Sequence, residues 1–427
     1  MNRLQYWMNN RPLLLILAIG LLARVSLLLW YMGTHGWEGE TWEYESIANN
    51  LLAGNGFVFQ YNNTDYHSYV VPVFPFLCAG LHLIGGSGLA LHYIFLLSSA
   101  AATIWLTYTL ALRLFGAGTA IASGLLVALE PGLIVYQSYK LDVVGWTIFL
   151  ILVGIHVFFR LMQRQRMQDA VLLGLVIGIG VLSRPDIVAL ASLLVVWLFS
   201  EGERWRQTAS LTVIVLTTSL VVISPWVVRN YLVHGQTVFM TTTTGIQLWL
   251  GNNANAAGTP MALDGRTQLD AAPDSFRERI LASSELEQAA LFTTAALEFI
   301  TADPLAFFGR MVKKFLYFWW FTPTFGLQYV WLTAWFTTLY KAAYAIILVL
   351  AAVGLWSAIK HGDVARRQVA AYLLTPVLLV GLIHSIYFVE GRHRVMVMPL
   401  ILLMAGYGIA VLREKKARTC WSNGSAV

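Results

Sequence analysis

PLLLILAIGLLARVSLLLWYM, residues 12–32, is an apolar run interrupted by one charge, that of Arg24. As a helix it is long enough to cross the hydrocarbon core of a membrane, which takes about 20 apolar residues. It follows a basic start, Arg3 and Arg11, and does not end in a small-residue cleavage site. We therefore interpret it as an uncleaved first membrane helix that exports the segment after it. We expect Arg24 to have a structural role, bonded to backbone carbonyls.

Apolar runs of similar length recur along the 427 residues, of which 58% are hydrophobic and only 12% are charged. This composition predicts an all-α polytopic membrane protein with about ten spans in a single membrane domain, residues 1–427. A β-barrel is disfavoured because the apolar stretches are continuous and do not alternate with polar residues. The predicted spans are 13–32, 89–112, 118–137, 141–160, 170–183, 187–200, 208–228, 333–358, 368–389 and 395–412. If 170–200 is one span, the stretch 309–329 must be another to keep the same topology.

The formal net charge of +6 does not indicate nucleic-acid binding, because the basic residues form short clusters beside the apolar segments. Such clusters follow the positive-inside rule and predict that both termini are cytoplasmic. Two long segments, 33–88 and 229–332, then lie outside. Cys78 and Cys420 are far apart in the sequence and lack metal-site spacing, so the sequence indicates neither a disulfide framework nor a zinc site.

The second outer segment begins with a polar stretch and continues into two predicted helices. DSFRERILASSELEQAALFTTAALEFI, residues 274–300, has the pattern of an amphipathic helix. FFGRMVKKFLYFWWF, residues 307–321, combines basic and aromatic side chains as interfacial helices do. We expect this loop to present a large polar surface on the outer side.

GWEGETWEYESIANN, residues 36–50, concentrates four of the 22 acidic residues in the first outer segment. We expect a helix from about Glu40 to Ala53, ended by the GNGF turn. Its apolar stripe, at helical spacing, comprises Tyr44, Ile47, Ala48, Leu51 and Leu52.

The four glutamates differ in their positions on this helix. Glu40 falls on the apolar stripe and Glu43 at its edge, whereas Glu45 falls on the opposite flank. We therefore expect Glu38 and Glu45 to be solvated residues of the first turn. Glu40 and Glu43 are the candidates for a catalytic carboxylate, one of which would act as a general base.

Cations recur at the outer ends of the predicted spans, where they oppose the orientation signal. They are Lys140, Arg184, Arg229, Lys313, Lys314, Arg392 and Arg394. Lys313 and Lys314 are equally well interpreted as headgroup anchors. Several cations that converge at one membrane face would bind an anion such as a lipid phosphate. An outward carboxylate beside such a site suggests group transfer from a lipid phosphate. Because nucleotide sugars are cytoplasmic, the sugar donor would be attached to a membrane lipid.

Two other classes remain open on these residues. A transporter or flippase of a lipid-linked sugar would use the same cations to steer the headgroup, although the spans hold few buried charges and no evident inverted repeat. A ligase that transfers whole glycans would use a large basic outer loop and no acid in the first outer segment.

Several motifs resemble the membrane glycosyltransferases of the GT-C superfold, in particular glycosyltransferase family 39, which includes protein O-mannosyltransferases and lipid A aminoarabinose transferases. The matching stretches, in family order, are GETWEYESIANNLLAGNGF followed by VPVFP, LEPGLIVYQSYKLDVVG, LSRPD, PWVVRNYLVHGQTVFMTTTTGIQLWLGNN and YFVEGRHRVMVMPLILLMAGYGI. The resemblance implies an inverting transferase of the bacterial inner membrane. It would move a sugar from a polyprenyl-phosphate-linked donor to a glycan, lipid or protein acceptor on the periplasmic side.

The resemblance also implies roles for individual residues. The catalytic acid of the family stands four residues before a tyrosine, which is Glu40 here, although some relatives keep a glutamate at the position of Glu43. An acidic residue opens the fourth span, here Asp142. No cofactor is assigned from the sequence, and a divalent metal held by Asp142 and a first-loop glutamate is left open. The charged pair that aminoarabinose transferases carry before the first-loop prolines is replaced by Val70 and Val71.

The remaining predicted site residues come from the cations at the span ends and from the two outer segments. The donor phosphate would be bound by Lys140, Arg184, Arg229, Arg392 and Arg394. Residues of the two outer segments would contact the sugar or the acceptor, namely Tyr44, Tyr66, His67, Asn252 and Asn253.

Overall fold

The computed structural model describes residues 3–36, 43–61, 64–86, 89–202, 204–262, 264–323 and 334–424, with side chains described from 11 to 415. Its helices are α1 (Arg3–His35), α2 (Glu43–Leu52), α3 (Val73–Gly85), α4 (Ala90–Phe115), α5 (Ala117–Leu129), α6 (Pro131–Tyr136), α7 (Val144–Arg164), α8 (Met167–Val181), the 3₁₀ helix η1 (Pro185–Ala191), α9 (Ser192–Ser200), α10 (Trp205–His234), α11 (Thr244–Leu250), α12 (Asp274–Leu281), α13 (Glu285–Ala302), α14 (Pro304–Trp319), α15 (Ala334–His361), α16 (Val364–Ile386), α17 (Gly391–Val395) and α18 (Met398–Gly424). The two strands described, β1 (Phe59–Tyr61) and β2 (Thr64–Tyr66), form one antiparallel hairpin.

Six of the described helices are long and apolar enough to cross a membrane, or seven if the bent pair α13 and α14 counts as one span. The six are α1 from Arg11 onward, α4, α7, α10, α15 and α16. They coincide with six of the ten predicted spans, and the predicted all-α, multi-pass class is confirmed. The other four predicted spans are also helical: shorter apolar helices at α5, α8 and η1 with α9, and α18, which becomes basic in its second half.

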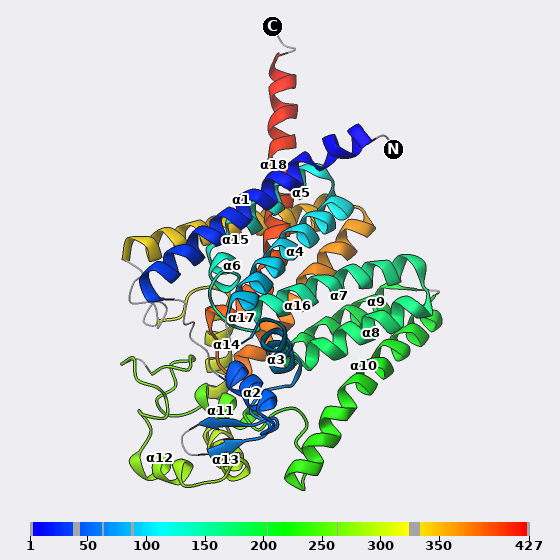
Figure 1. The fold of residues 1–427 in the computed structure, drawn as a ribbon. Helices are drawn as coiled ribbons and strands as arrows, with labels where there is room; N and C mark the ends of the chain where they lie inside the picture. Colours follow the sequence, from blue (N-terminus) through cyan, green and yellow to red (C-terminus); the bar gives the residue numbers. More distant parts are fainter. Residues whose placement is uncertain are drawn as a thin grey trace.

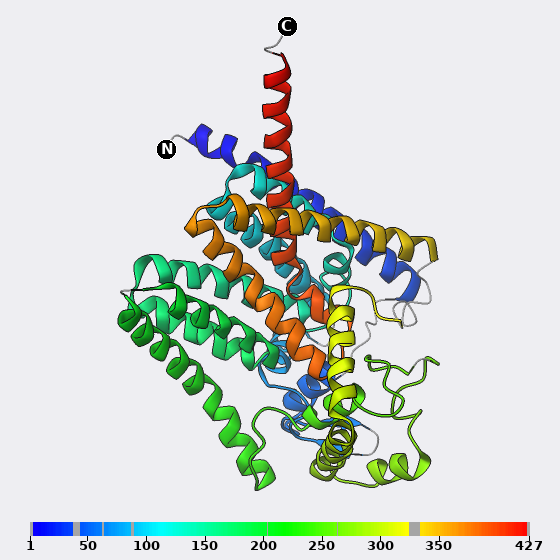
Figure 2. The same cartoon turned by 180° about the vertical axis from the view of Figure 1, so that it is seen from behind.

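The chain has two distinct ends (Figure 1). The beginning of α1 and the end of α18 lie together at one end, while α2, the hairpin, α11, α12 and α13 gather at the other. The view from behind shows α14 standing between this lower group and the long helices (Figure 2). Both termini therefore lie on the side opposite the large loops, the arrangement that the distribution of basic residues predicts.

Helix α18 forms the centre of the upper bundle and packs closely against α15 and α5. A Cβ on Gly354 would lie 2.2 Å from the carbonyl of Met404, and one on Gly408 would lie 2.1 Å from the carbonyl of Leu350. Only glycine at these two positions lets the backbones of α15 and α18 approach so closely, as small residues do at helix interfaces in membranes. This close packing fixes the position of α18, the helix that directly follows α17 in the chain.

The prediction of one long amphipathic helix over 274–300 is wrong in one respect, because the structure divides this stretch into two helices, α12 and α13. Ser284 caps α13 and forms a capping box with Glu287, whose Oε2 accepts from the Ser284 backbone amide at 2.8 Å. The S-x-x-E spacing in the sequence is the signature of such a start. α13 then meets α14 at a bend of 107°.

Lys314 on α14 is not a headgroup anchor, since only 1% of it is exposed. Its Nζ donates to the carbonyls of Gly251, Ile386 and Tyr387 at 3.3, 3.1 and 2.7 Å. Lys313 beside it is exposed. Lys314 thus joins α14 to the C-terminal end of α16 and to the loop after α11.

Arg24 has the structural role predicted for it. It is fully buried in α1, and its guanidinium donates to the carbonyls of Ala128 at 2.9 Å and Val127 at 3.3 Å, and to Gln137 Oε1 at 3.2 Å. These carbonyls belong to the last turn of α5 and have no partner within that helix. Arg24 therefore caps α5 from a neighbouring span.

An Arg24→Leu variant is expected to lose about 3 kcal/mol of stability, because buried carbonyls are left without donors. Thermal unfolding of the protein in detergent would measure the loss. Arg11→Leu, an exposed position on the same helix, is the matched control and should leave the melting temperature unchanged. Equal melting temperatures for wild type and Arg24→Leu would contradict this role.

Candidate active site

One large cavity, of about 2230 Å³, opens among ends of the long helices and the two long segments 33–88 and 229–332. Its polar wall comes from α2, the stretch 241–244, η1 and α17, and its apolar wall from α1, α6, α15 and α16. Six of the predicted site residues line it: Glu43, Tyr44, Lys140, Arg184, Arg392 and Arg394. The structure therefore brings together residues that are up to 351 positions apart in the sequence (394 − 43).

Helix α2 presents Glu43 to this cavity because its other faces are packed. Ile47 and Ala48 are fully buried, as the predicted stripe requires, whereas Leu52 is exposed and does not belong to it. The ring of Tyr44 packs edge-on against Phe74 of α3, with centroids 5.0 Å apart. The helix ends at the predicted turn, where Gly54 has φ +81°, a conformation that favours glycine.

The environment of Glu43 favours its neutral form. Burial raises the pKa of this carboxyl above its ordinary value; a backbone hydrogen bond opposes the change, the carboxylate of Asp142 adds to it, and Arg392 opposes it. A carboxylate with a raised pKa is a stronger base near neutral pH. Glu43 is thus suited to accept a proton inside the cavity.

Arg392 is the cation most directly associated with these carboxylates. It lies on α17, where its Nε contacts Glu390 Oε2 at 2.6 Å and its Nη1 lies 3.6 Å from Asp142 Oδ2. The side chain is 37% exposed, so the guanidinium also faces the cavity. An arginine held on one side by carboxylates and open on the other can bind a phosphate with its remaining donors.

Arg184 belongs to a second polar group on the cavity wall. Its Nε lies 2.8 Å from Asp186 Oδ2, which also lies 3.0 Å from His384 Nε2. The His384 ring stacks on that of His393, with centroids 3.5 Å apart. This group connects η1, α16 and α17, and it holds Arg184 at the cavity surface.

Lys140 lies in the connection between α6 and α7. Its Nζ lies 5.4 Å from the centre of the Tyr136 ring, and both residues line the cavity. The attraction between an ammonium group and an aromatic face helps to hold Lys140 at the cavity surface.

Two of the predicted phosphate ligands have structural partners. Arg229 is absent from the cavity lining; its Nη1 donates to the carbonyl of His67 at 2.6 Å, and the guanidinium lies over the Trp226 ring at 4.8 Å. Arg394 reaches the lining, but only 3% of it is exposed. Its Nη1 donates to the carbonyl of Trp320 at 2.7 Å, so it anchors the segment after α14.

The two predicted contact residues of the first outer segment also lie outside the cavity lining. The Tyr66 hydroxyl donates to Gln288 Oε1, and the His67 amide donates to Glu285 Oε2 at 2.8 Å. Both therefore dock the hairpin onto α13.

The paired asparagines after α11 are structural as well and are absent from the cavity lining. Asn252 is fully buried and donates to the carbonyl of Ile386 at 2.9 Å, and Asn253 donates to that of Trp249 at 2.8 Å. Tyr44 is thus the one predicted substrate-contact residue in the lining.

Asp142, the proposed metal ligand, has a cationic neighbour in the described structure. Its Oδ2 faces Arg392, and its Oδ1 accepts from the Val144 amide at 3.2 Å. Among the described residues, the cluster of three side chains suited to a metal does not include Asp142. The geometry around Asp142 favours an ion pair with Arg392.

The prediction for Glu45 is wrong. This residue is 4% exposed, and its carboxylate lies between His82 and His92. The helical pattern of α2 alone could not show that two histidines of α3 and α4 cover that flank. Glu38 and Glu40 lie outside the described residues, so the choice between Glu40 and Glu43 as the base stays a prediction.

Other cavity residues were not predicted, among them Asp186, His384, Glu390 and His393. Three of the four stand within two residues of Arg184 or Arg392 in the SRPD and EGRHR motifs. The motifs therefore contained these residues, but the sequence did not show which side chains of the two motifs would contact one another.

This fold and this cavity define the class: an all-α, multi-pass membrane protein with the GT-C fold, whose long loops and helix ends enclose one large site. Residues 67–228 match the family model of dolichyl-phosphate-mannose-protein mannosyltransferases. The resemblance inferred from the motifs is confirmed, since these residues match that family model and the fold is similar to that of a GT-C membrane glycosyltransferase. No curated protein matches the chain in sequence.

The structure is similar to two structures of archaeal oligosaccharyltransferase from Archaeoglobus fulgidus. The apo form has a TM-score of 0.57 at 15% identity, over 98% of this chain and 52% of that chain. AglB, an oligosaccharyltransferase from the same organism, in complex with an inhibitory peptide and a dolichol-phosphate has a TM-score of 0.55 at 14% identity, over 99% of this chain and 52% of that chain. ArnT from Cupriavidus metallidurans bound to undecaprenyl phosphate has a TM-score of 0.41 at 16% identity, over 92% and 77%. The chain spans about half the length of AglB.

Proposed function

We propose that this protein is an inverting glycosyltransferase that moves a sugar from a polyprenyl-phosphate-linked donor to an acceptor hydroxyl on the outer side of the membrane. The observation that supports it most is that Glu43, a carboxylate with a raised pKa, and Arg392, a partly exposed cation, line the same large cavity. A base and a phosphate ligand are the two groups that this reaction needs.

The reaction breaks one bond and forms one bond at the anomeric carbon. The acceptor oxygen attacks that carbon from the face opposite the phosphate, while Glu43 takes the proton of the hydroxyl. The bond between the anomeric carbon and the phosphate oxygen breaks, and its electron pair leaves with the polyprenyl phosphate. The attack from the opposite face inverts the anomeric configuration.

The developing charge of the leaving phosphate is stabilised by the cations of the cavity. Arg392 and Arg184 are held in place by carboxylates and keep their donors near the cavity surface. Fixed cations stabilise a charge that grows in the transition state without having to reorganise. Lys140 adds a third positive charge to the same lining.

The apolar wall of the cavity suits the lipid part of the donor. Leu27 and Trp30 on α1, and Trp335 and Phe336 on α15, line it beside the polar groups. Both helices are among the membrane-crossing ones. A polyprenyl chain could therefore stay in the apolar phase while its phosphate reaches Arg392. AglB, whose fold the chain shares, has been solved with a dolichol-phosphate, which supports a lipid phosphate as leaving group.

Mass spectrometry of lipid extracts tests this function. Cells that lack the protein should accumulate one polyprenyl-phosphate-linked monosaccharide, and the wild-type gene should remove it. That lipid, in vesicles with the purified protein and an outer-membrane or envelope acceptor fraction, should give free polyprenyl phosphate and a glycosylated product of inverted configuration by nuclear magnetic resonance. Movement of the intact donor across the vesicle would instead indicate a flippase. Accumulation of a pyrophosphate-linked oligosaccharide would indicate a glycan ligase.

A further inference from the structure

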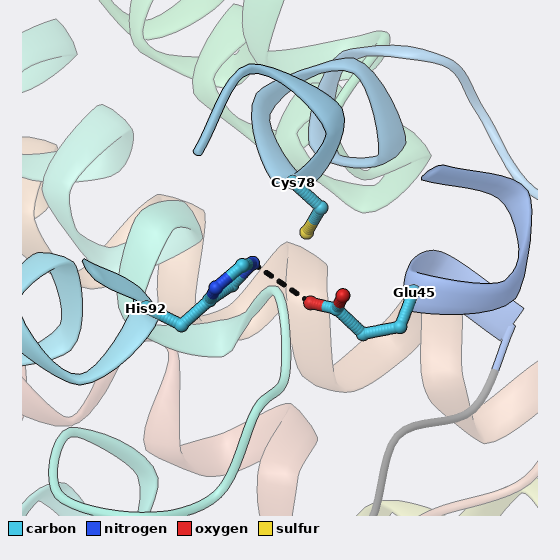
Figure 3. Close-up of side chains that lie close together, drawn as sticks. All are labelled: Glu45, Cys78 and His92. Atoms are coloured by element: carbon cyan, nitrogen blue, oxygen red, sulfur yellow. Dashed lines mark ion pairs between the residues drawn. The ribbon is translucent and has the colours of Figure 1, made fainter. Parts of the chain in front are cut away.

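A second cluster of reactive side chains lies behind α2, away from the large cavity. Glu45 of α2, Cys78 of α3 and His92 of α4 place a carboxylate oxygen, a thiol sulfur and an imidazole nitrogen within 4.8 Å of one another. Figure 3 shows the three side chains pointing toward one another from their helices. All three residues are more than nine-tenths buried. Three helices thus converge on one point through groups that commonly bind metal ions.

His82, one turn after Cys78 on α3, extends the cluster. His82 Nε2 lies 2.9 Å from Glu45 Oε2, while His92 Nε2 lies 2.8 Å from Glu45 Oε1. The two imidazole rings meet at an angle of 64° with centroids 4.8 Å apart. Each oxygen of the one carboxylate therefore faces a different histidine.

These short contacts do not have the directions of hydrogen bonds. Among the described residues, Glu45 Oε2 and all four ring nitrogens of His82 and His92 are buried without a hydrogen-bond partner. Buried polar atoms are almost always hydrogen-bonded. Three of these atoms have only the carboxylate–imidazole contacts, and both Nδ1 atoms have no partner within the described part of the chain, so the cluster calls for an explanation. A cavity of about 10 Å³, lined by Glu45, Cys78 and His92, lies beside them.

We propose that Glu45, Cys78 and His92 bind a divalent cation of the Zn²⁺ class, with His82 as a fourth ligand or as the outer partner of the Glu45 carboxylate. Thiolate sulfur, imidazole nitrogen and carboxylate oxygen are the ligand types of Zn²⁺, at about 2.0–2.3 Å. Ligand atoms around such an ion lie about 3–4 Å apart in a tetrahedron, and the cluster is compact enough for this. A hard cation such as Mg²⁺ is excluded because it prefers oxygen ligands and keeps its waters.

This ion has a structural task. Glu45 follows Glu43 by two residues, and α2 turns them to different sides: Glu43 to the large cavity and Glu45 to the cluster. Tyr44 lines both cavities. An ion that joins α2 to α3 and α4 would fix the rotation of α2 and hence the position of the Glu43 carboxylate. Structural Zn²⁺ contributes directly to folding free energy.

Metal analysis of the full-length protein purified in detergent tests the site without any activity measurement. We expect about one Zn²⁺ per chain by inductively coupled plasma mass spectrometry, lost in Glu45→Gln, Cys78→Ser and His92→Gln. Cys420→Ser, which changes the only other cysteine, and His361→Gln, at an exposed position on α15, are the matched controls and should keep the metal. Glu43→Gln should also keep it while losing transfer, which separates this site from the proposed function.

Spectroscopy of wild-type protein covers the case in which the variants do not fold. Removing the metal with a chelator should lower the melting temperature, and Zn²⁺ should restore it. Co²⁺ added to the metal-free protein should give the visible bands of tetrahedral cobalt with a thiolate charge-transfer band, and the latter should be missing in Cys78→Ser. Wild-type protein that contains no metal and shows neither a cobalt spectrum nor a melting shift would overturn the proposal and leave a metal-free polar cluster.

Discussion

A Glu43→Gln variant is expected to transfer sugar about 10²–10⁴-fold more slowly than wild type, the range by which a general base accelerates a reaction. The amide keeps the size of the side chain but cannot take the proton of the acceptor hydroxyl. Because the donor is bound by cations and apolar residues elsewhere in the cavity, KM for the donor should change little while kcat falls. Initial rates in vesicles at saturating acceptor would measure both quantities.

Two further variants make this result specific. Glu298→Gln, an exposed glutamate of α13, should transfer at the wild-type rate. Glu40→Gln tests the rival candidate, which the resemblance favours and which lies outside the described residues. If Glu40→Gln alone is inactive, the base is Glu40 and Glu43 has a supporting role. Wild-type transfer rates in both variants would rule out Glu40 and Glu43 as the general base.

The fold was predictable because membrane helices can be recognised from their apolar composition alone. The run 12–32 and five other long runs are apolar enough to identify without knowing their neighbours. Arg24 could also be interpreted correctly, since a charge inside such a run must find partners and a helix end offers free carbonyls. The split between α12 and α13 was missed although the Ser284 capping box was visible, because the apolar pattern continues across it.

The site was predictable only in part, because the sequence does not show what covers each flank of a helix. Glu45 was placed in solvent by its position on α2, and it is buried only because His82 and His92 come from two other helices. Likewise, Arg392 and Arg394 stand two positions apart in one short helix, which turns them about 200° from each other. One faces the cavity beside Asp142, and the other lies against the Tyr344 ring at 4.1 Å.

An Arg392→Ala variant is expected to lose about 10²–10³-fold in kcat, the cost of removing one fixed group that stabilises the transition-state charge. Arg392→Lys should recover part of the rate, since it keeps the charge but not the two-pronged geometry. Arg229→Lys serves as a comparison, because Arg229 lies outside the cavity lining. It should alter stability more than kcat. A kcat for Arg392→Ala equal to that of wild type would remove Arg392 from the phosphate site.

The pH dependence of these variants tests whether Arg392 also acts on Glu43. Arg392 lowers the pKa of Glu43 and Asp142 raises it, on top of the larger increase due to burial. A base must be ionised, so activity rises with pH through the pKa of Glu43. Removing Arg392 raises that pKa further and should move the acidic limb of the kcat/KM profile to higher pH, whereas Asp142→Asn should move it to lower pH. Shifts in the same direction, or no shift in either variant, would mean that the limb belongs to another group than Glu43.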